Sequence, residues 1–303
     1  MYEVDRVLAA TDGSEHGMNA LVTSAYCARR SGASLDIVTV AESVIAPVGI
    51  DVALYEDTFA DQLRAQVEAQ MAQAEATEAP LHLQSGLAAP IITEVAEETG
   101  ADLIVVGAHP RPAVARFLVG STAERVIRMA HRPVLVAIEQ RREPFRRILV
   151  AVDLSGQSLR VLEAAVATAI ACGSELRALY VQDRLTPMLL EAALFDEKET
   201  RHHARSQLKK TVAKVSLPSE LMVSQEVREG HAGQEILHAA EEWNADLVVM
   251  GAHGFGFFNR LLLGSISTYV LRHGNRATLV VPRSESREPE AGPSGSARGP
   301  KAS

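Results

Sequence analysis

The sequence predicts an α/β protein that contains two repeated, doubly wound, five-stranded parallel-sheet domains. The first observation is a duplication, since RVLAATDGS from Arg6 matches RILVAVDLS from Arg147. In the same order, ADLIVVGAHP from Ala101 matches ADLVVMGAHG from Ala245. The second observation is that short apolar runs alternate with helical stretches in both halves, which is typical of parallel strands joined by crossover helices.

The duplication divides the chain into a first domain over residues 1–140 and a second over residues 145–283. The boundary falls at the charged stretch EQRREPFRR, from Glu139 to Arg147. The tail over residues 284–303 is rich in Gly, Pro, Ser and charge, so it cannot bury a core and we expect it to be disordered.

The strands are expected where apolar runs lack polar alternation, which indicates burial on both faces of the sheet. In the first domain these runs are Val7–Ala10, Leu35–Val40, Leu81–Gln84, Leu103–Val106 and Pro133–Ile138. In the second domain they are Ile148–Val152, Leu176–Val181, Leu221–Val227, Leu247–Met250 and Thr278–Val281.

Helices are expected between these strands, in the same order in each domain. The first domain has them at Asn19–Arg30, Asp57–Glu78 and Pro90–Thr99, and the second at Leu159–Cys172, Asp196–Val215 and Gln234–Trp243. A further helix follows the fourth strand of each domain, after a glycine-containing loop.

Composition excludes several classes of function. The net charge of -8 argues against a general nucleic-acid binder, which would carry a basic patch. No apolar stretch approaches the roughly 18 residues of a membrane span, and no signal peptide is evident. The two cysteines, Cys27 and Cys172, have no metal-ligand or redox-motif spacing. We therefore expect a cytoplasmic protein in a reducing compartment, with no nucleic-acid or membrane partner and no metal site.

The loop after the fourth strand of the second domain carries the main functional signal. It reads GAHGFGFFNRLLLGS from Gly251 to Ser265, and places Gly254 and Gly264 in the spacing G-x2-G-x9-G-S. Ligands of open parallel sheets bind beyond the carboxyl ends of the strands, where this loop lies. Glycine lets backbone N–H groups approach a ligand closely, and a helix start binds phosphate through its unpaired N–H groups. The hydroxyls of Ser265 and Ser267 can add donors, so the pattern predicts a phosphate site.

Together with the DxS sequence after the first strand, this motif resembles the ATP-binding universal stress proteins. The resemblance covers both repeats, and it implies a Rossmann-like, adenine nucleotide α-hydrolase-like fold. It also implies that ATP, with Mg²⁺, binds in the second repeat and changes how the protein meets a protein partner. The residues that the resemblance places at this nucleotide are Ala151, Val152, Asp153, Val181, Met250, Gly251, Gly254, Gly264, Ser265, Ile266 and Ser267.

The first repeat departs from the motif because Pro110 stands where the second repeat has Gly254. Proline has no N–H and cannot adopt a positive φ, so we expect this site to be degraded for ATP. What remains of the motif there is Asp12, Val40, Gly107, Gly120, Ser121 and Thr122. Asp12 and Asp153 have a second reading that is equally compatible with the sequence, as caps of the helices that follow them.

Other functions are less well supported. The sequence has no GxxxxGK[ST], no GxGxxG after the first strand and no GxSxG, so P-loop, dinucleotide and hydrolase-elbow sites are not indicated. No catalytic residue is assigned, and any ATP hydrolysis should be slow. One alternative is a nucleotide-free interaction module of the same fold. A weaker one is an adenylating enzyme, which would want an SGGxDS-like loop that ATDGSEHG only faintly matches.

The duplication also predicts an intramolecular pseudo-dimer. By the resemblance, the two repeats pair through their last strands, Val134–Ile138 and Leu279–Val281. Such pairing would cover edges that otherwise invite aggregation. A homodimer of the whole chain is compatible with the sequence, which does not decide it.

Overall fold

The computed structural model describes residues 4–42, 52–108, 121–182, 197–253 and 263–283. Several sequence predictions fall outside these ranges, namely those for Pro110, Gly120, Gly254 and the tail over residues 284–303. In the described ranges, each expected strand and helix overlaps an observed one.

The first repeat follows the expected alternation of strands and helices. Its strands are β1 (Arg6–Thr11), β2 (Ser34–Ala41), β3 (Leu81–Ser85), β4 (Leu103–Gly107) and β5 (Val134–Ala137). Its helices are α1 (Glu15–Ser31), α2 (Val52–Gln73), α3 (Ala88–Thr99) and α4 (Ser121–Met129). Helix α2 ends before the expected Glu78, because Glu75 takes a left-handed φ of 56° that an α-helix cannot continue through.

The second repeat has the same plan. Its strands are β6 (Arg147–Val152), β7 (Glu175–Gln182), β8 (Val223–Glu229), β9 (Leu247–Gly251) and β10 (Ala277–Val281). Its helices are α5 (Ser158–Cys172), α7 (Glu197–Val212), α8 (Ala232–Glu242) and α9 (Ser265–His273). Strand β8 begins at Val223 and not at the expected Leu221, because the N–H of Leu221 closes a turn onto the carbonyl of Pro218 at 3.1 Å.

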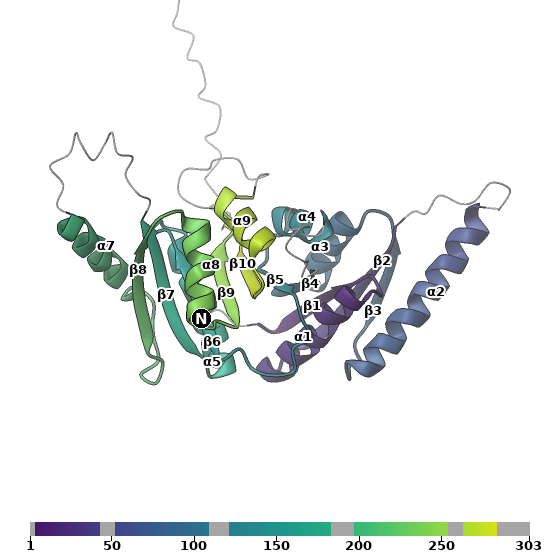
Figure 1. Cartoon of the computed structure of the whole chain (residues 1–303). Coiled ribbons are helices and arrows are strands. Elements are labelled where there is room, and N and C mark those ends of the chain that lie inside the picture. Colours follow the sequence, from purple (N-terminus) through teal and green to yellow (C-terminus); the bar gives the residue numbers. More distant parts are fainter. Residues whose placement is uncertain (1–3, 43–51, 109–120, 183–196, 254–262, 284–303) are drawn as a thin grey trace, which may run out of the picture.

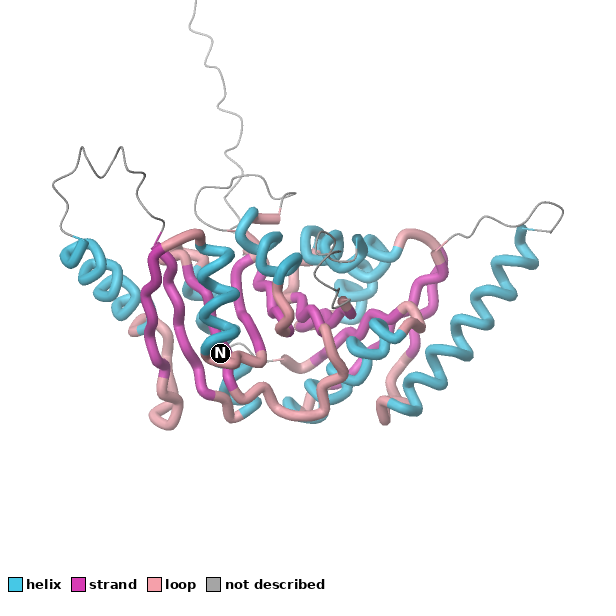
Figure 2. Tube along the Cα trace, viewed as in Figure 1, coloured by secondary structure: helices cyan, strands magenta, loops and turns pink. Residues whose placement is uncertain are grey.

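All ten strands belong to one continuous sheet, in the order β3-β2-β1-β4-β5-β10-β9-β6-β7-β8 (Figures 1 and 2). The strands within each repeat are parallel, and β5 and β10 pair antiparallel with Leu135 opposite Leu279. The predicted pairing of the last strands is therefore confirmed. As a result, the last strand of each repeat is interior, and the edges of the sheet are β3 and β8.

Helices cover both faces of the sheet, as Figure 1 shows. One face carries α1, α2, α5 and α7, and the other carries α3, α4, α8 and α9. The largest apolar cluster joins the repeats, because it contains Val7 and Leu135 of the first together with Ile148 and Leu279 of the second. The two halves thus share a core as well as a sheet.

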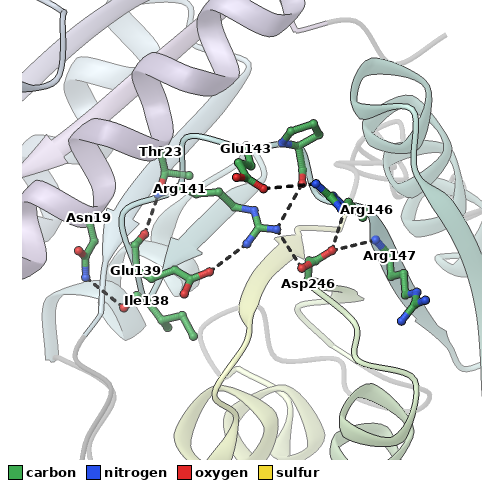
Figure 3. A network of polar contacts seen from close by, with 10 residues as sticks. Asn19, Thr23, Ile138, Glu139, Arg141, Glu143, Arg146, Arg147 and Asp246 are labelled. Carbon is green, nitrogen blue, oxygen red and sulfur yellow. Dashed lines mark hydrogen bonds and ion pairs between the residues drawn. The ribbon is translucent and has the colours of Figure 1, made fainter.

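The segment between the repeats is held by a network of polar contacts around Arg141 (Figure 3). Its guanidinium lies 2.9 Å from a carboxylate oxygen of Glu139 and 2.9 Å from Oδ1 of Asp246, and it stacks over the buried ring of Phe145. The other oxygen of Asp246 accepts the backbone N–H groups of Arg146 and Arg147, at 2.7 and 3.0 Å. On the other side, the backbone N–H of Arg141 donates to Oγ1 of Thr23 on α1, at 3.3 Å. The segment is therefore held to the second repeat by charge-assisted bonds and to the first by a neutral hydrogen bond.

Candidate functional site

The carboxyl ends of β6, β7 and β9 surround a cavity of about 580 Å³ in the second repeat. Helices α8 and α9 begin at the same edge and complete its walls. All the predicted site residues that lie in the described ranges line this cavity. They are Ala151, Val152, Asp153, Val181, Met250, Gly251, Gly264, Ser265, Ile266 and Ser267. Gly254, the remaining one, lies outside the described residues.

Asp153 presents one carboxylate oxygen that has no hydrogen-bond partner among the described residues. Its Oδ1 accepts three hydrogen bonds, from the N–H and the hydroxyl of Ser155 at 3.0 and 2.6 Å and from the hydroxyl of Ser158 at 2.7 Å. Its Oδ2 is buried without a partner in the part of the chain that the structure describes. A buried acceptor in this condition is costly, so a ligand donor would stabilise it.

Asp12 and Asp153 are not the N-cap residues of the helices that follow them, although the sequence was compatible with that role. The N-cap of α1 is Ser14, whose hydroxyl oxygen accepts the N–H of Gly17 at 3.1 Å, and the N-cap of α5 is Gln157. Asp12 and Asp153 instead order the turn before the cap, since Asp12 accepts the N–H and hydroxyl of Ser14 just as Asp153 does for Ser155. Support of the turn uses only Oδ1 and leaves Oδ2 of Asp153 for a ligand.

The start of α9 supplies N–H groups on another side of the cavity. Gly264 is the N-cap, with φ -58° and ψ 148°, and the first helical bond runs from the N–H of Thr268 to its carbonyl at 2.9 Å. The N–H groups of Ser265, Ile266 and Ser267 precede this first bond, so the helix gives them no carbonyl partner. They also carry the positive end of the helix dipole, which favours an anion.

Ser267 has a different role from the one its hydroxyl suggested. Its side chain is 2% exposed, and the hydroxyl donates to the carbonyl oxygens of Gly251 and Ala252, at 2.8 and 3.2 Å. The hydroxyl therefore fastens the start of α9 to the end of β9. The backbone N–H of Ser267 is what remains for an anion, whereas Ser265 has an exposed side chain.

Sequence reasoning missed several residues that line this cavity. Helix α5 contributes Gln157 and Val161, and Tyr180 and Gln182 flank the predicted Val181 on β7. His253 also lines the cavity and is half-buried. The rule that ligands meet the carboxyl ends of strands could have found Gln182 and His253, because both stand directly at such an end.

The first repeat has a corresponding cavity of about 660 Å³. Of the residues predicted for a degraded second site, Asp12, Val40, Gly107 and Thr122 line it. Gly120 lies outside the described residues, and the described backbone places Ser121 at the start of α4. Both repeats therefore hold a cavity at the same topological place.

In the described part of the chain, no group of three or more His, Cys, Asp and Glu side chains is placed to hold a metal ion. No helix in those ranges combines the length and the apolar character needed to cross a bilayer.

These features define a tandem α/β protein in which each repeat holds a cavity at the carboxyl edge of a joined sheet. The model of the universal stress protein family matches the chain twice, over residues 3–137 and 144–282. The chain belongs to the universal stress protein family, as a tandem member.

Individual relatives agree with this assignment. A universal stress protein of Mycobacterium tuberculosis is 28% identical over 202 residues, which cover 64% of this chain and 62% of the relative. A universal stress protein of Synechocystis is 32% identical over 152 residues, which cover 45% of this chain and 97% of the relative. The crystal structure of a universal stress protein from Archaeoglobus fulgidus matches 93% of this chain and 100% of its own, with a TM-score of 0.69 and 22% identity. At that identity the structural match speaks for the fold alone.

Proposed function

We propose that the cavity of the second repeat binds ATP. Its volume of about 580 Å³ lies within the range of roughly 300–1,000 Å³ that is usual for small-molecule sites. The adenosine would lie against the ends of β6 and β7, where Val181 offers backbone groups and Asp153 an acceptor for a hydroxyl. The phosphates would lie at the N–H groups that begin α9.

One observation carries this proposal. The wall of this cavity holds a carboxylate oxygen of Asp153 and the N–H groups of Ser265, Ile266 and Ser267, and none of these groups has a hydrogen-bond partner among the described residues. Ribose hydroxyls are donors and phosphate oxygens are acceptors, so a nucleotide complements both groups. An apolar ligand would leave both groups unsatisfied.

Mg²⁺ would enter with the nucleotide, since this ion is commonly held by substrate phosphates and one or two carboxylates. The proposal gives the chain no catalytic residue and at most slow hydrolysis. Binding of ATP would instead act as a signal, by changing a surface that a protein partner meets during a stress response. A nucleotide-free interaction module is the competing function.

Calorimetric titration of the full chain with ATP tests the proposal, and the expected stoichiometry is one per chain. Asp153→Asn keeps the Oδ1 acceptor and replaces the open oxygen by an amide donor, so we expect ATP affinity to fall about tenfold or more. Asp12→Asn is the matched control in the first repeat and should leave ATP affinity unchanged. No binding by the unaltered chain would favour the nucleotide-free module, and two equal sites would contradict the placement.

Gly254→Pro offers a second test that comes from the sequence alone, because Gly254 lies outside the described residues. The change copies Pro110 of the first repeat, so the fold should tolerate it. We expect most ATP binding to be lost, since proline has no N–H to donate. Normal binding by this variant would show that the loop is not a phosphate contact.

A further inference from the structure

The cavity of the second repeat lies across three neighbouring strands, and their order gives it two ends. Strands β9, β6 and β7 stand side by side in the sheet, and each ends at the cavity. Helix α9, where the phosphates are proposed to lie, follows β9 in the chain. Asp153 follows β6, and Val181 and Gln182 are the last residues of β7. A nucleotide with its phosphates at α9 and its ribose at Asp153 therefore places its base at the end of β7.

Gln182 brings a side-chain amide to that end of the cavity. Its Oε1 is buried and accepts no hydrogen bond in the part of the chain that the structure describes. The backbone of Gln182 is held in place, because its carbonyl oxygen accepts the N–H of Gly230 at 3.0 Å. The strand end is thus fixed while the amide oxygen lacks a donor. A buried acceptor in this condition is costly, so a ligand that supplies a donor is favoured.

The other amide in the wall of this cavity is already engaged. Nε2 of Gln157 donates to the carbonyl oxygen of Pro282 at 2.7 Å, and the hydroxyl of Ser158 donates to Asp153 at 2.7 Å. Two buried side-chain oxygens of the wall, Oδ2 of Asp153 and Oε1 of Gln182, accept no hydrogen bond from a described residue. The first lies where the ribose is proposed to bind, and the second lies where the base is.

The first repeat has no amide at the matching place. The N–H of Gly86 donates to the carbonyl oxygen of Ala41 at 3.1 Å, just as the N–H of Gly230 does to that of Gln182, so Ala41 and Gln182 hold equivalent positions. Alanine has no side-chain acceptor. Because a methyl group suffices at this strand end in one repeat, the amide in the other is not required by the fold.

We propose that Gln182 recognises the exocyclic amino group of adenine, and so sets the base preference of the second cavity. Oε1 accepts an N–H of that group, and Nε2 donates to the adjacent ring nitrogen, as glutamine does to N6 and N7 of adenine in nucleic acids. Guanine has O6 and N7 at the same edge, both acceptors, and offers Oε1 no donor there. This inference rests on the function proposed for the cavity and adds the residue that selects the base.

ATP and purine riboside triphosphate are the probes, because the second lacks only the amino group. In calorimetric titrations of the full chain we expect ATP to bind about tenfold more tightly, since Oε1 keeps no donor in the other complex. Gln182→Ala copies Ala41 of the first repeat, so the fold should tolerate it. In this variant the two affinities should agree within about twofold, because the acceptor that distinguishes them is gone. Circular dichroism checks that the variant folds.

Gln182→Glu keeps an acceptor oxygen at the same place, so it should restore a preference for ATP that Gln182→Ala has lost. A side chain that only fills space would give no such restoration. Equal affinities of the unaltered chain for the two nucleotides would overturn the inference and leave the ATP site standing. A preference that survives in Gln182→Ala would do the same. If the unaltered chain bound neither nucleotide, the proposed function would fail as well, so the two failures are distinguishable.

Discussion

Gly107 and Gly251 hold the same place at the ends of β4 and β9, yet the structure predicts opposite results when each is changed to alanine. On Gly107 the new Cβ would lie 2.0 Å from the carbonyl oxygen of His16 and 2.6 Å from its carbonyl carbon. Those are backbone atoms at the start of α1, so no side-chain rotation relieves the contact. On Gly251 the nearest atoms are the carbonyl oxygen of His253 at 3.3 Å and a methyl of Val161 at 3.5 Å.

The magnitude follows from how far the chain must move. An ordinary contact of about 3.4 Å requires the start of α1 to shift by more than about 1 Å, and overpacking of this kind costs about 1–3 kcal/mol. Because backbone must move, we expect Gly107→Ala to lower the free energy of unfolding by about 3 kcal/mol. The same principle gives Gly251→Ala less than about 1 kcal/mol, since a few tenths of an ångström suffice.

Urea unfolding followed by circular dichroism measures both variants against the unaltered chain, with comparison of midpoints and slopes. Gly251→Ala serves as the matched control for the loss of glycine at this topological place. The reasoning would be refuted if the two variants shifted the midpoint equally. It would also be refuted if Gly107→Ala were the milder change.

Three further predictions concern contacts between the repeats. Glu124→Gln removes the carboxylate that lies 3.1 Å from the guanidinium of Arg272 on α9, and should cost about 1 kcal/mol of stability, with a smaller loss in high salt. Arg141→Met leaves the carboxylate of Asp246 without its cation, so limited trypsin digestion should cut between the repeats faster. Burial raises the pKa of the Cys27 thiol to about 12 from an ordinary 9.0, so iodoacetamide should label Cys27 about a thousandfold more slowly in the native chain than in urea at pH 8. The unfolded chain releases this proton at lower pH than the native chain, so the contribution to stability is lost as pH rises from about 9 to about 12.

Much of the fold was predictable because the signal is local and repeated. Residues Leu103–Val106 and Leu247–Met250 are continuous apolar runs, and each lies within a buried interior strand. The pairing of β5 with β10 was expected from the resemblance to universal stress proteins, and the duplication supplies both strands within one chain. The end of α2 was not predictable in this way, because the left-handed φ of Glu75 leaves no mark on apolar periodicity.

The candidate site was predictable in its membership and less so in its chemistry. The residues predicted at the second cavity line it wherever the structure describes them, since they all follow from one rule about strand ends. The motif predicted that the hydroxyl of Ser267 donates to a phosphate, but this hydroxyl already donates to the carbonyl of Gly251. The motif also assigned Gly107 and Gly251 one role. Their difference comes from where α1 and α5 begin, which is a property of packing that no motif spacing encodes.

The joined sheet explains how the two cavities can differ within one fold. Strands β5 and β10 cover each other, and because they belong to one chain this pairing does not depend on protein concentration. The contacts around Arg141 that hold the repeats together involve Glu139, Asp246 and Phe145, which are not among the described residues lining either cavity. The shared core, in contrast, reaches the second cavity through Val152 and Val161. A change at Asp12 or Asp153 therefore alters one cavity and leaves the contacts around Arg141 in place, so each repeat serves as a matched control for the other.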